Sequence, residues 1–408
     1  MANTNSLRLV VKIVSLRVVD RVYFCQNKSE LSMILQLHNW RCFEQADFSL
    51  PTEPIVILDR NGSGKTSLLS AIYSLFTGLP FPETKFIFCL KQNNTYFGLQ
   101  VLDQPKAWFL NGKLSPNNHR LTTKWEIPEL LHLDFAKQPV STKEWQIFTY
   151  LPTDNYWLTL SRSDKLRVLD DLLGQIYGPD YNHNLKRLQQ AQTQKLAILR
   201  HCQQDNQPLD YSLYLTYSQL LFKHSVKLWH YRANFFQFWQ TRLPELNTWL
   251  ERSYNDWQIY WEITSPSGHR QPLASLTNPT WEPPDWTKLA SQELAAEKLL
   301  YGAQRDDFKI WCNQTDCINV LSRGEMRSLI LFSKHLASQL NAKPYTIWLL
   351  DDVFNELDSS REQLILQTML QQASWFVATA TKNLDYLSVP KCSLSDLLKT
   401  PKPSFDNV

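Results

Sequence analysis

The chain has 408 residues, a formal net charge of +3, 43% hydrophobic residues and 20% charged residues. This length and balance are typical of a folded protein with room for two or three compact units, and they exclude a disordered chain. So small a net charge does not identify a nucleic-acid binder, because affinity for DNA depends on where Lys and Arg cluster.

The first 32 residues suit neither a membrane span nor an export signal. Residues 7–24 are rich in Val and Leu, but five charged side chains interrupt them too often for a transmembrane helix or a signal-peptide core: Arg8, Lys12, Arg17, Asp20 and Arg21. We expect residues 1–32 to be poorly integrated with the fold, either as an accessory extension or as a misassigned start that precedes Met33.

A strand, a glycine-bearing loop and a helix are predicted next. The apolar run 55–58 precedes the loop, and apolar residues then recur at helical spacing from Leu68 to Phe76. This context is typical of a phosphate-binding loop. The candidate nucleotide-binding residues are Arg60, Asn61, Gly62, Ser63, Gly64, Lys65, Thr66 and Ser67.

Each part of this loop has a chemical use. Small residues let successive backbone N–H groups and the helix N-terminus face a phosphate chain, Lys65 adds a positive charge, and the Thr66 hydroxyl is a candidate Mg²⁺ ligand. The full pattern has Gly where this chain has Asp59, which lacks glycine's tolerance of positive φ and repels phosphate unless its carboxylate points away. A strand-to-helix turn without a ligand remains the alternative.

The middle of the chain predicts a helical lobe rather than a long rod. Apolar residues alternate steps of four and three from Tyr217 to Phe238, and Leu185, Leu188, Leu196 and Leu199 indicate a partner helix. Arms of this kind reach roughly 35 Å. His224 lies within the apolar stripe and is interpreted as a core residue, not as a metal ligand. Residues 161–200 carry seven basic and four acidic side chains, which indicates at most a weak DNA footprint.

Three elements are expected after the lobe. Alternation of Trp257, Ile259 and Trp261 with polar residues predicts a half-buried strand that returns to the part of the fold that contains the phosphate loop. Six prolines and glycines make residues 265–285 a surface connection, and residues 291–300 favour a helix.

A second nucleotide motif is expected near the C-terminus. Residues 346–350 predict a buried strand that ends in Asp351 and Asp352, and buried carboxylates require a cation or hydrogen bonds. Asp351 is therefore a candidate Mg²⁺ ligand, and Asp352 a candidate to orient or deprotonate the attacking water. The alternative is a turn after a core strand, with both acids solvated. For the motif Ser322-Arg323-Gly324-Glu325 the alternative is an ordinary helix N-cap.

Seven scattered cysteines form neither a convincing zinc pattern nor a disulfide framework, and reduced cytoplasmic thiols are the simplest account.

Together these motifs resemble the RecF family, within the superfamily of SMC and ABC-type ATPases. The resemblance extends from about Met33 to about Leu387. The matching segments are residues 35–43, 69–73, 150–154, 163–170, 302–308 (where Gln304 replaces the family's His), 322–327 and 351–358.

The resemblance implies an ATP-switched DNA clamp in which two subunits enclose two ATP molecules. Each ATP would be held by the phosphate loop of one chain and capped in trans by Ser322, Arg323, Gly324 and Glu325 of the other, with Asp358 in the D-loop across the interface. Thr379 would occupy the switch position after the strand 375–378, and with Asp352 it completes the catalytic pair.

The predicted fold is an α/β P-loop ATPase head of the ABC/SMC type, built from both ends of the chain, with an inserted helical lobe. About 255 residues lie between Thr66 and Leu321, too few for the coiled coil of an SMC protein. The expected parts are an extension (1–32), the N-terminal part of the head (33–150), the lobe (151–255), the C-terminal part of the head (256–395) and a frayed tail (396–408).

The function implied by the resemblance is recombinational repair and replication-fork maintenance in the cytoplasm, within the response to DNA damage. The chain would bind ATP and Mg²⁺, dimerise with ATP, engage gapped or duplex DNA, and assist RecA loading with RecO and RecR, as a weak DNA-stimulated ATPase at most. Two other functions are alternatives. One is a scaffold whose phosphate loop is degraded by Asp59, and the other is a nuclease with a similar head, for which too little chain follows Asp385.

Overall fold

A five-stranded parallel sheet takes its strands from both ends of the chain. The order is β10 (Trp145–Tyr150), β15 (Tyr345–Leu350), β16 (Trp375–Ala380), β5 (Ile55–Leu58) and β17 (Lys391–Cys392), and every neighbouring pair is parallel. Continuous apolar runs such as that of β5 are typical of strands covered on both faces. The predicted α/β class, with a head built from both ends, is confirmed.

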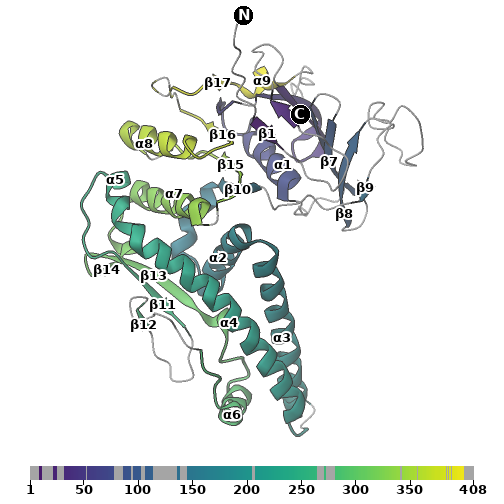
Figure 1. Ribbon diagram of the computed structural model, residues 1–408, viewed down its shortest axis with the longest axis vertical. Coiled ribbons are helices and arrows are strands. Elements are labelled where there is room, and N and C mark those ends of the chain that lie inside the picture. The colour runs from purple at the N-terminus through teal and green to yellow at the C-terminus, as the bar shows by residue number, and fades with distance from the viewer. Residues whose placement is uncertain are drawn as a thin grey trace, which may run out of the picture. The chain divides into compact units, whose positions relative to one another are not determined.

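The computed structural model describes residues 9–11, 22–24, 32–51, 53–77, 86–92, 95–102, 106–113, 136–137, 145–204, 207–263, 271–272, 281–340, 342–355, 357–382, 384, 386 and 388–398 (Figure 1). They form two units. The first comprises residues 1–152, 343–355 and 366–408, and the second comprises residues 153–342 and 356–365. The predicted domain boundaries stay a prediction.

The first unit also contains a six-stranded antiparallel sheet. Its order is β4 (Phe43–Pro51), β3 (Ser32–Trp40), β6 (Phe86–Gln92), β7 (Thr95–Leu102), β8 (Lys106–Lys113) and β9 (Ala136–Lys137). The predicted opening strand and its turn are confirmed, because β3 and β4 are joined by a tight turn at residues 41–42.

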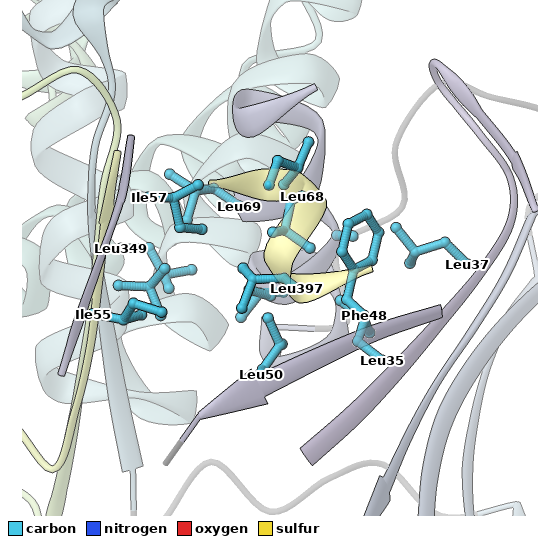
Figure 2. Packing of buried hydrophobic residues seen from close by; sticks show 14 of the residues in the cluster. Leu35, Leu37, Phe48, Leu50, Ile55, Ile57, Leu68, Leu69, Leu349 and Leu397 are labelled. Carbon is cyan, nitrogen blue, oxygen red and sulfur yellow. The ribbon is translucent and has the colours of Figure 1, made fainter. Parts of the chain in front are cut away.

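Helices α1 (Lys65–Thr77) and α9 (Leu394–Leu397) fill the space between the two sheets. Figure 2 shows Ile55, Ile57 and Leu349 of the parallel sheet on one side, and the labelled side chains of the antiparallel sheet on the other, which are Leu35, Leu37, Phe48 and Leu50. Leu68 and Leu69 of α1 and Leu397 of α9 lie between them. This shared core holds α1, the helix that follows the phosphate loop, against the parallel sheet.

The second unit is largely helical. Its helices are α2 (Arg162–Tyr177), α3 (Pro179–Gln204), α4 (Tyr211–Arg242), α5 (Leu246–Leu250), α6 (Trp286–Ala296) and α7 (Arg323–Leu340), and α8 (Ser359–Leu370) begins in this unit. The predicted helix pair is confirmed, because α3 and α4 lie side by side (Figure 1). Leu221, Leu228 and Leu188 are buried along their seam. The predicted inserted helical lobe is thus present.

A four-stranded antiparallel sheet completes the second unit, in the order β12 (Gln271–Pro272), β11 (Gln258–Glu262), β13 (Asp307–Cys312) and β14 (Thr315–Asp316). The half-buried strand predicted at 257–263 is confirmed as β11. The helix expected at 291–300 begins earlier, at Trp286, because the Asp285 carboxylate caps it, and it ends at Ala296, where Glu297 adopts a left-handed backbone.

Several basic side chains of residues 161–200 are used inside the second unit. Lys195 is fully buried and pairs with Glu293 at 2.7 Å. Lys165 pairs with Asp307 at 2.6 Å. Two of the seven basic side chains in this segment are therefore part of the core, and they cannot contribute to the weak DNA footprint considered there.

Little of the two chain ends is described. In the extension, β1 (Leu9–Val11) and β2 (Val22–Phe24) pair with each other in antiparallel fashion. The remainder of residues 1–31, most of the connection at 265–285 and residues 399–408 lie outside the described residues. Among the described helices, none combines the length and apolar character that a bilayer span requires.

Candidate nucleotide site

The candidate nucleotide-binding and catalytic residues lie at the ends of three neighbouring strands of the parallel sheet. β5 leads into the phosphate loop, β15 leads directly to Asp351 and Asp352, and β16 carries Thr379 next to its last residue. These strands are parallel, with Leu58 opposite Ala380 and Leu350 opposite Ala378, so their carboxyl ends meet at one edge. That edge is where α/β sheets bind their ligands.

Hydrogen bonds connect all three strand ends around Asp351. The Thr66 hydroxyl donates to one carboxylate oxygen of Asp351 at 2.6 Å, and the Thr379 hydroxyl donates to the other at 2.6 Å. Asp351 is only 4% exposed and Thr379 is 0% exposed. Because both oxygens of the buried carboxylate accept a hydrogen bond, its desolvation is offset. The alternative of two solvated acids after a core strand does not hold for Asp351.

Thr379 also fixes the neighbouring Asp352. The backbone N–H of Asp352 donates to the Thr379 hydroxyl at 3.0 Å. Asp352 has a φ of 50°, in the left-handed region that non-glycine residues rarely adopt. The threonine thus links the two acids, and it holds the second in a backbone conformation that the chain would otherwise avoid.

The phosphate loop depends on glycine at two positions. Gly62 and Gly64 have φ values of 79° and 107°. A Cβ at Gly64 would lie 2.6 Å from the Phe43 ring, whereas a Cβ at Gly62 would meet nothing within 4 Å. The Ser63 hydroxyl is buried and has no partner among the described residues. An open glycine turn, an orphaned hydroxyl and the N-terminus of α1 together fit an anion such as a phosphate group.

Lys65 and Asp59 lie at the start of this loop. The Lys65 ammonium donates to the carbonyl oxygens of Asp59 at 2.6 Å and Arg60 at 2.8 Å, and the side chain is 7% exposed. One carboxylate oxygen of Asp59 accepts from the Arg60 N–H at 2.8 Å, and the other accepts from the Leu394 N–H at 3.3 Å.

The structure removes both physical objections to Asp59. Its φ lies outside the left-handed region, so glycine is not required there. Its carboxylate accepts a hydrogen bond from the first residue of α9, and repulsion of a phosphate was expected only if the carboxylate did not point away. The strength of nucleotide binding stays a prediction.

Sequence reasoning missed the residues that hold α1 in place. The turn after β3 lies against the loop, where the Trp40 indole donates to the Ser67 carbonyl at 2.8 Å and the Phe43 ring lies beside Gly64. The similarity of residues 35–43 to a family segment was a signal that this turn matters, but it did not say that the turn touches the phosphate loop.

The motif of residues 322–325 begins α7 in the second unit. The Ser322 N–H donates to the Glu325 carboxylate at 2.8 Å, and the Glu325 N–H donates to the Ser322 hydroxyl at 3.3 Å. This is a capping box, so the helix N-cap considered above is present. Ser322 and Arg323 are exposed, whereas Gly324 and Glu325 are buried. Because Ser322 and Arg323 are exposed, the capping role does not prevent them from contacting another molecule.

Two acids of the second unit are held in the ionised form. Burial disfavours ionisation of Glu325, but hydrogen bonds from Ser322 and the charge of Arg252 keep its pKa below the usual value. Burial likewise opposes ionisation of Asp358, but hydrogen bonds from Arg361 and Ser360 lower its pKa. Asp358 accepts from the Arg361 N–H at 3.0 Å at the start of α8.

No group of three or more metal-ligating side chains occurs among the residues that the structure describes. His224, interpreted as a core residue, is half-buried and hydrogen-bonds to the Asn184 amide at 3.0 Å. Cys42, Cys202, Cys312, Cys317 and Cys392 are free thiols.

Comparison with known proteins finds similarity to proteins named RecF, both in sequence and in structure. The "DNA replication and repair protein RecF" of Bacillus mycoides is 24% identical over 350 residues, which cover 85% of this chain and 91% of that protein. No family model matches the chain. The resemblance to the RecF family predicted from the motifs is confirmed.

Two solved structures share the fold. The recombination mediator protein RecF-ATPrS in the RecFOR pathway has a TM-score of 0.61 at 18% identity, over 90% of this chain and 98% of that one. The corresponding RecF-ATP structure has a TM-score of 0.61 at 16% identity, over 86% of this chain and 94% of that one. At these identities the two structures establish the fold.

Proposed function

We propose that this protein is an ATP-dependent DNA-binding protein of recombinational repair and replication-fork maintenance, similar to RecF. The observation that carries the proposal is the hydrogen-bonded set of Thr66, Asp351 and Thr379, which joins a phosphate loop to a buried acid at one sheet edge. The relatives are named as replication and repair proteins, and two solved structures of similar fold are described with ATP or ATPrS.

The residues at this edge fit Mg²⁺ as well as ATP. The Thr66 hydroxyl and the Asp351 carboxylate present two oxygen atoms 2.6 Å apart, and oxygen is the donor that Mg²⁺ prefers. When bound there, Mg²⁺ would neutralise charge on the β- and γ-phosphates.

The other residues of the site act on the phosphates and on water. Lys65 exchanges its two loop carbonyls for phosphate oxygens, and the backbone N–H groups of residues 62–66 and the Ser63 hydroxyl donate to them. Thr379 holds Asp351 and Asp352 in fixed relation, so that Asp352 can orient or deprotonate the attacking water. Arg60, Asn61 and Ser67 line the remainder of the loop.

Hydrolysis is proposed to require two copies of the chain. Ser322 and Gly324 of one copy would cap the γ-phosphate held by the phosphate loop of the other, with Arg323, Glu325 and Asp358 beside them. The exposed position of Ser322 at the N-terminus of an 18-residue helix supports this role, because such an end attracts anions. ATP would then favour the dimer, because a ligand shifts an equilibrium only through differential affinity.

DNA and repair proteins are the proposed partners. The dimer would engage single-strand gaps or duplex DNA and assist RecA loading together with RecO and RecR. The description of the solved RecF structures as part of the RecFOR pathway supports these partners.

The test is ATPase activity measured against protein concentration, with and without DNA, for wild type, Lys65→Ala and Asp352→Asn. A rate that rises with the square of concentration at low protein, and is lost in both variants, supports shared sites. A wild type that takes up no ATP would contradict the proposal and would favour a scaffold with a degraded loop.

A further inference from the structure

A short turn in the second unit contacts two of the motifs discussed above. Residues 250–254 comprise the last residue of α5 and the turn after it, and we call them the brace. Glu251 adopts a left-handed backbone with a φ of 51°. The Asn247 side chain fixes the far end of the brace, because it donates to the Tyr254 carbonyl at 2.8 Å and accepts from the Tyr254 N–H at 3.1 Å. Two hydrogen bonds therefore hold Tyr254 against α5.

One side of the brace contacts the loop that begins α7. The Arg252 guanidinium lies 3.0 Å from one carboxylate oxygen of Glu325, and the Tyr254 hydroxyl donates to the same oxygen at 3.2 Å. The other oxygen of Glu325 accepts from the Ser322 N–H at 2.8 Å. A single buried carboxylate thus connects the brace to Ser322.

The other side of the brace contacts the start of α8. The Leu250 carbonyl accepts from the Arg361 guanidinium at 2.8 Å. The Ser360 hydroxyl lies 3.0 Å from the Glu251 carboxylate and 2.9 Å from the Asp358 carboxylate, so its single proton is shared between them. Asp358, the D-loop residue, is therefore linked to the brace through two residues, Ser360 and Arg361, each of which contacts both.

The exposed fraction of the Arg252 side chain favours a positioning role for this residue over a role in the core. The Arg252 side chain is 61% exposed, whereas the Glu325 side chain that it contacts is 2% exposed. Removing the guanidinium therefore opens no cavity, but it leaves the Tyr254 hydroxyl to hold that oxygen of the carboxylate that orients Ser322.

We propose that the brace positions the loop of Ser322 and the loop of Asp358 as one piece, with Arg252 and Tyr254 as positioning residues. The inference rests on the proposed function, in which both loops face the nucleotide of a second copy. Disturbing the brace should then weaken the ATP-dependent dimer, while the chain's own phosphate loop keeps its affinity for nucleotide.

The first test compares Arg252→Met with wild type by sedimentation velocity in Mg²⁺ and the slowly hydrolysed analogue ATPγS. We expect the dimer to dissociate about threefold more readily in Arg252→Met, because a half-exposed ion pair contributes modestly, and about tenfold in the double variant with Tyr254→Phe. ATPγS affinity at monomer concentrations should be unchanged. Arg252→Lys should recover part of the loss, and Arg242→Met, which removes an exposed pair with Glu245, is the matched control.

A mixing experiment separates positioning from general damage. Lys65→Ala has a defective phosphate loop and an intact brace. The double variant, Arg252→Met with Tyr254→Phe, has an intact phosphate loop and a defective brace. Their mixed dimer contains one site with both halves intact, so mixing should restore ATP hydrolysis above that of either variant alone. Absence of recovery would contradict a role in trans.

The outcomes distinguish the two proposals. If wild type dimerises with ATPγS and the double brace variant dimerises equally well, the brace inference is wrong and the proposed function stands. If wild type does not dimerise with ATPγS, both fail, because the two loops then meet no partner nucleotide.

Discussion

The Thr66 hydroxyl donates a 2.6 Å hydrogen bond to the Asp351 carboxylate across 285 positions of sequence. This contact joins the first residues of α1 to the end of β15, and Thr379 supports it from β16. Two motifs at opposite ends of the chain are therefore parts of one site, arranged by the order of strands in the parallel sheet.

Asp351→Asn should weaken binding of ATP in the presence of Mg²⁺ by about tenfold, because the amide removes a charged ligand of the ion. Binding of ATP in a chelator should be unchanged. Calorimetric titration in both buffers measures the difference, with the exposed Glu53→Gln as the control in the same unit. Equal losses in both buffers would show that Asp351 acts through the fold instead of the metal.

Thr379→Val should slow hydrolysis about tenfold or more while it leaves ATP affinity within about threefold, because the hydroxyl positions both acids but does not touch the loop. Thr346→Val is the matched control, since Thr346 is a similarly buried threonine of the same sheet that accepts a hydrogen bond from Gln146 at 3.0 Å. Single-turnover kinetics distinguishes the two variants, and identical rates would count against the role of Thr379.

Asp59→Gly restores the residue that the phosphate-loop pattern has at this position. We expect ATP affinity to change by less than about threefold, because the Asp59 carboxylate is already turned toward Leu394. Stability should fall by about 1 kcal/mol, since glycine loses the hydrogen bond to α9 and adds backbone entropy to the unfolded chain. A gain in affinity of tenfold or more would mean that this carboxylate opposes the phosphates.

His335 on α7 should make the second unit sensitive to acid. Burial lowers the pKa of His335 to about 4 from an ordinary value of 6.5, so the imidazole stays neutral in the folded protein. In the unfolded chain the imidazole binds a proton below pH 6.5, whereas in the folded chain it stays neutral until the pH falls to about 4. Stability due to this group is therefore full above pH 6.5 and is lost as the pH falls toward 4.

The measurement is urea unfolding of wild type and His335→Gln between pH 4 and pH 7. The stability of wild type relative to the variant should decline by up to about 3 kcal/mol as the pH falls. Asp306, whose pKa burial raises to about 6, titrates in both proteins and cancels in the comparison. A constant difference across this range would show that His335 is not held neutral.

Local patterns predicted the elements of the site but not the way they meet. The strand before Lys65, the helix after it and the strand before Asp351 follow from apolar periodicity over a few residues, and the structure has all three. The bonds from Thr66 and Thr379 to Asp351 depend on which strands are neighbours, and periodicity carries no information about strand order.

Charged residues were the hardest to interpret from the sequence. Lys195 has the appearance of a surface charge on a helix, yet it is buried because Glu293, far along the chain, neutralises it. Arg252 and Glu251 belong to no motif, and their contacts with Glu325 and Ser360 exist only in the folded unit. A single sequence shows which side chains are charged, but it does not show which residues they pair with in the fold.

The central claim is that nucleotide held by the phosphate loop brings two copies of the chain together. It is tested most directly by sedimentation velocity of wild type and Lys65→Ala, each with and without Mg-ATP. The account predicts a dimer for wild type with Mg-ATP and a monomer in the three other samples. Identical sedimentation of all four would contradict it.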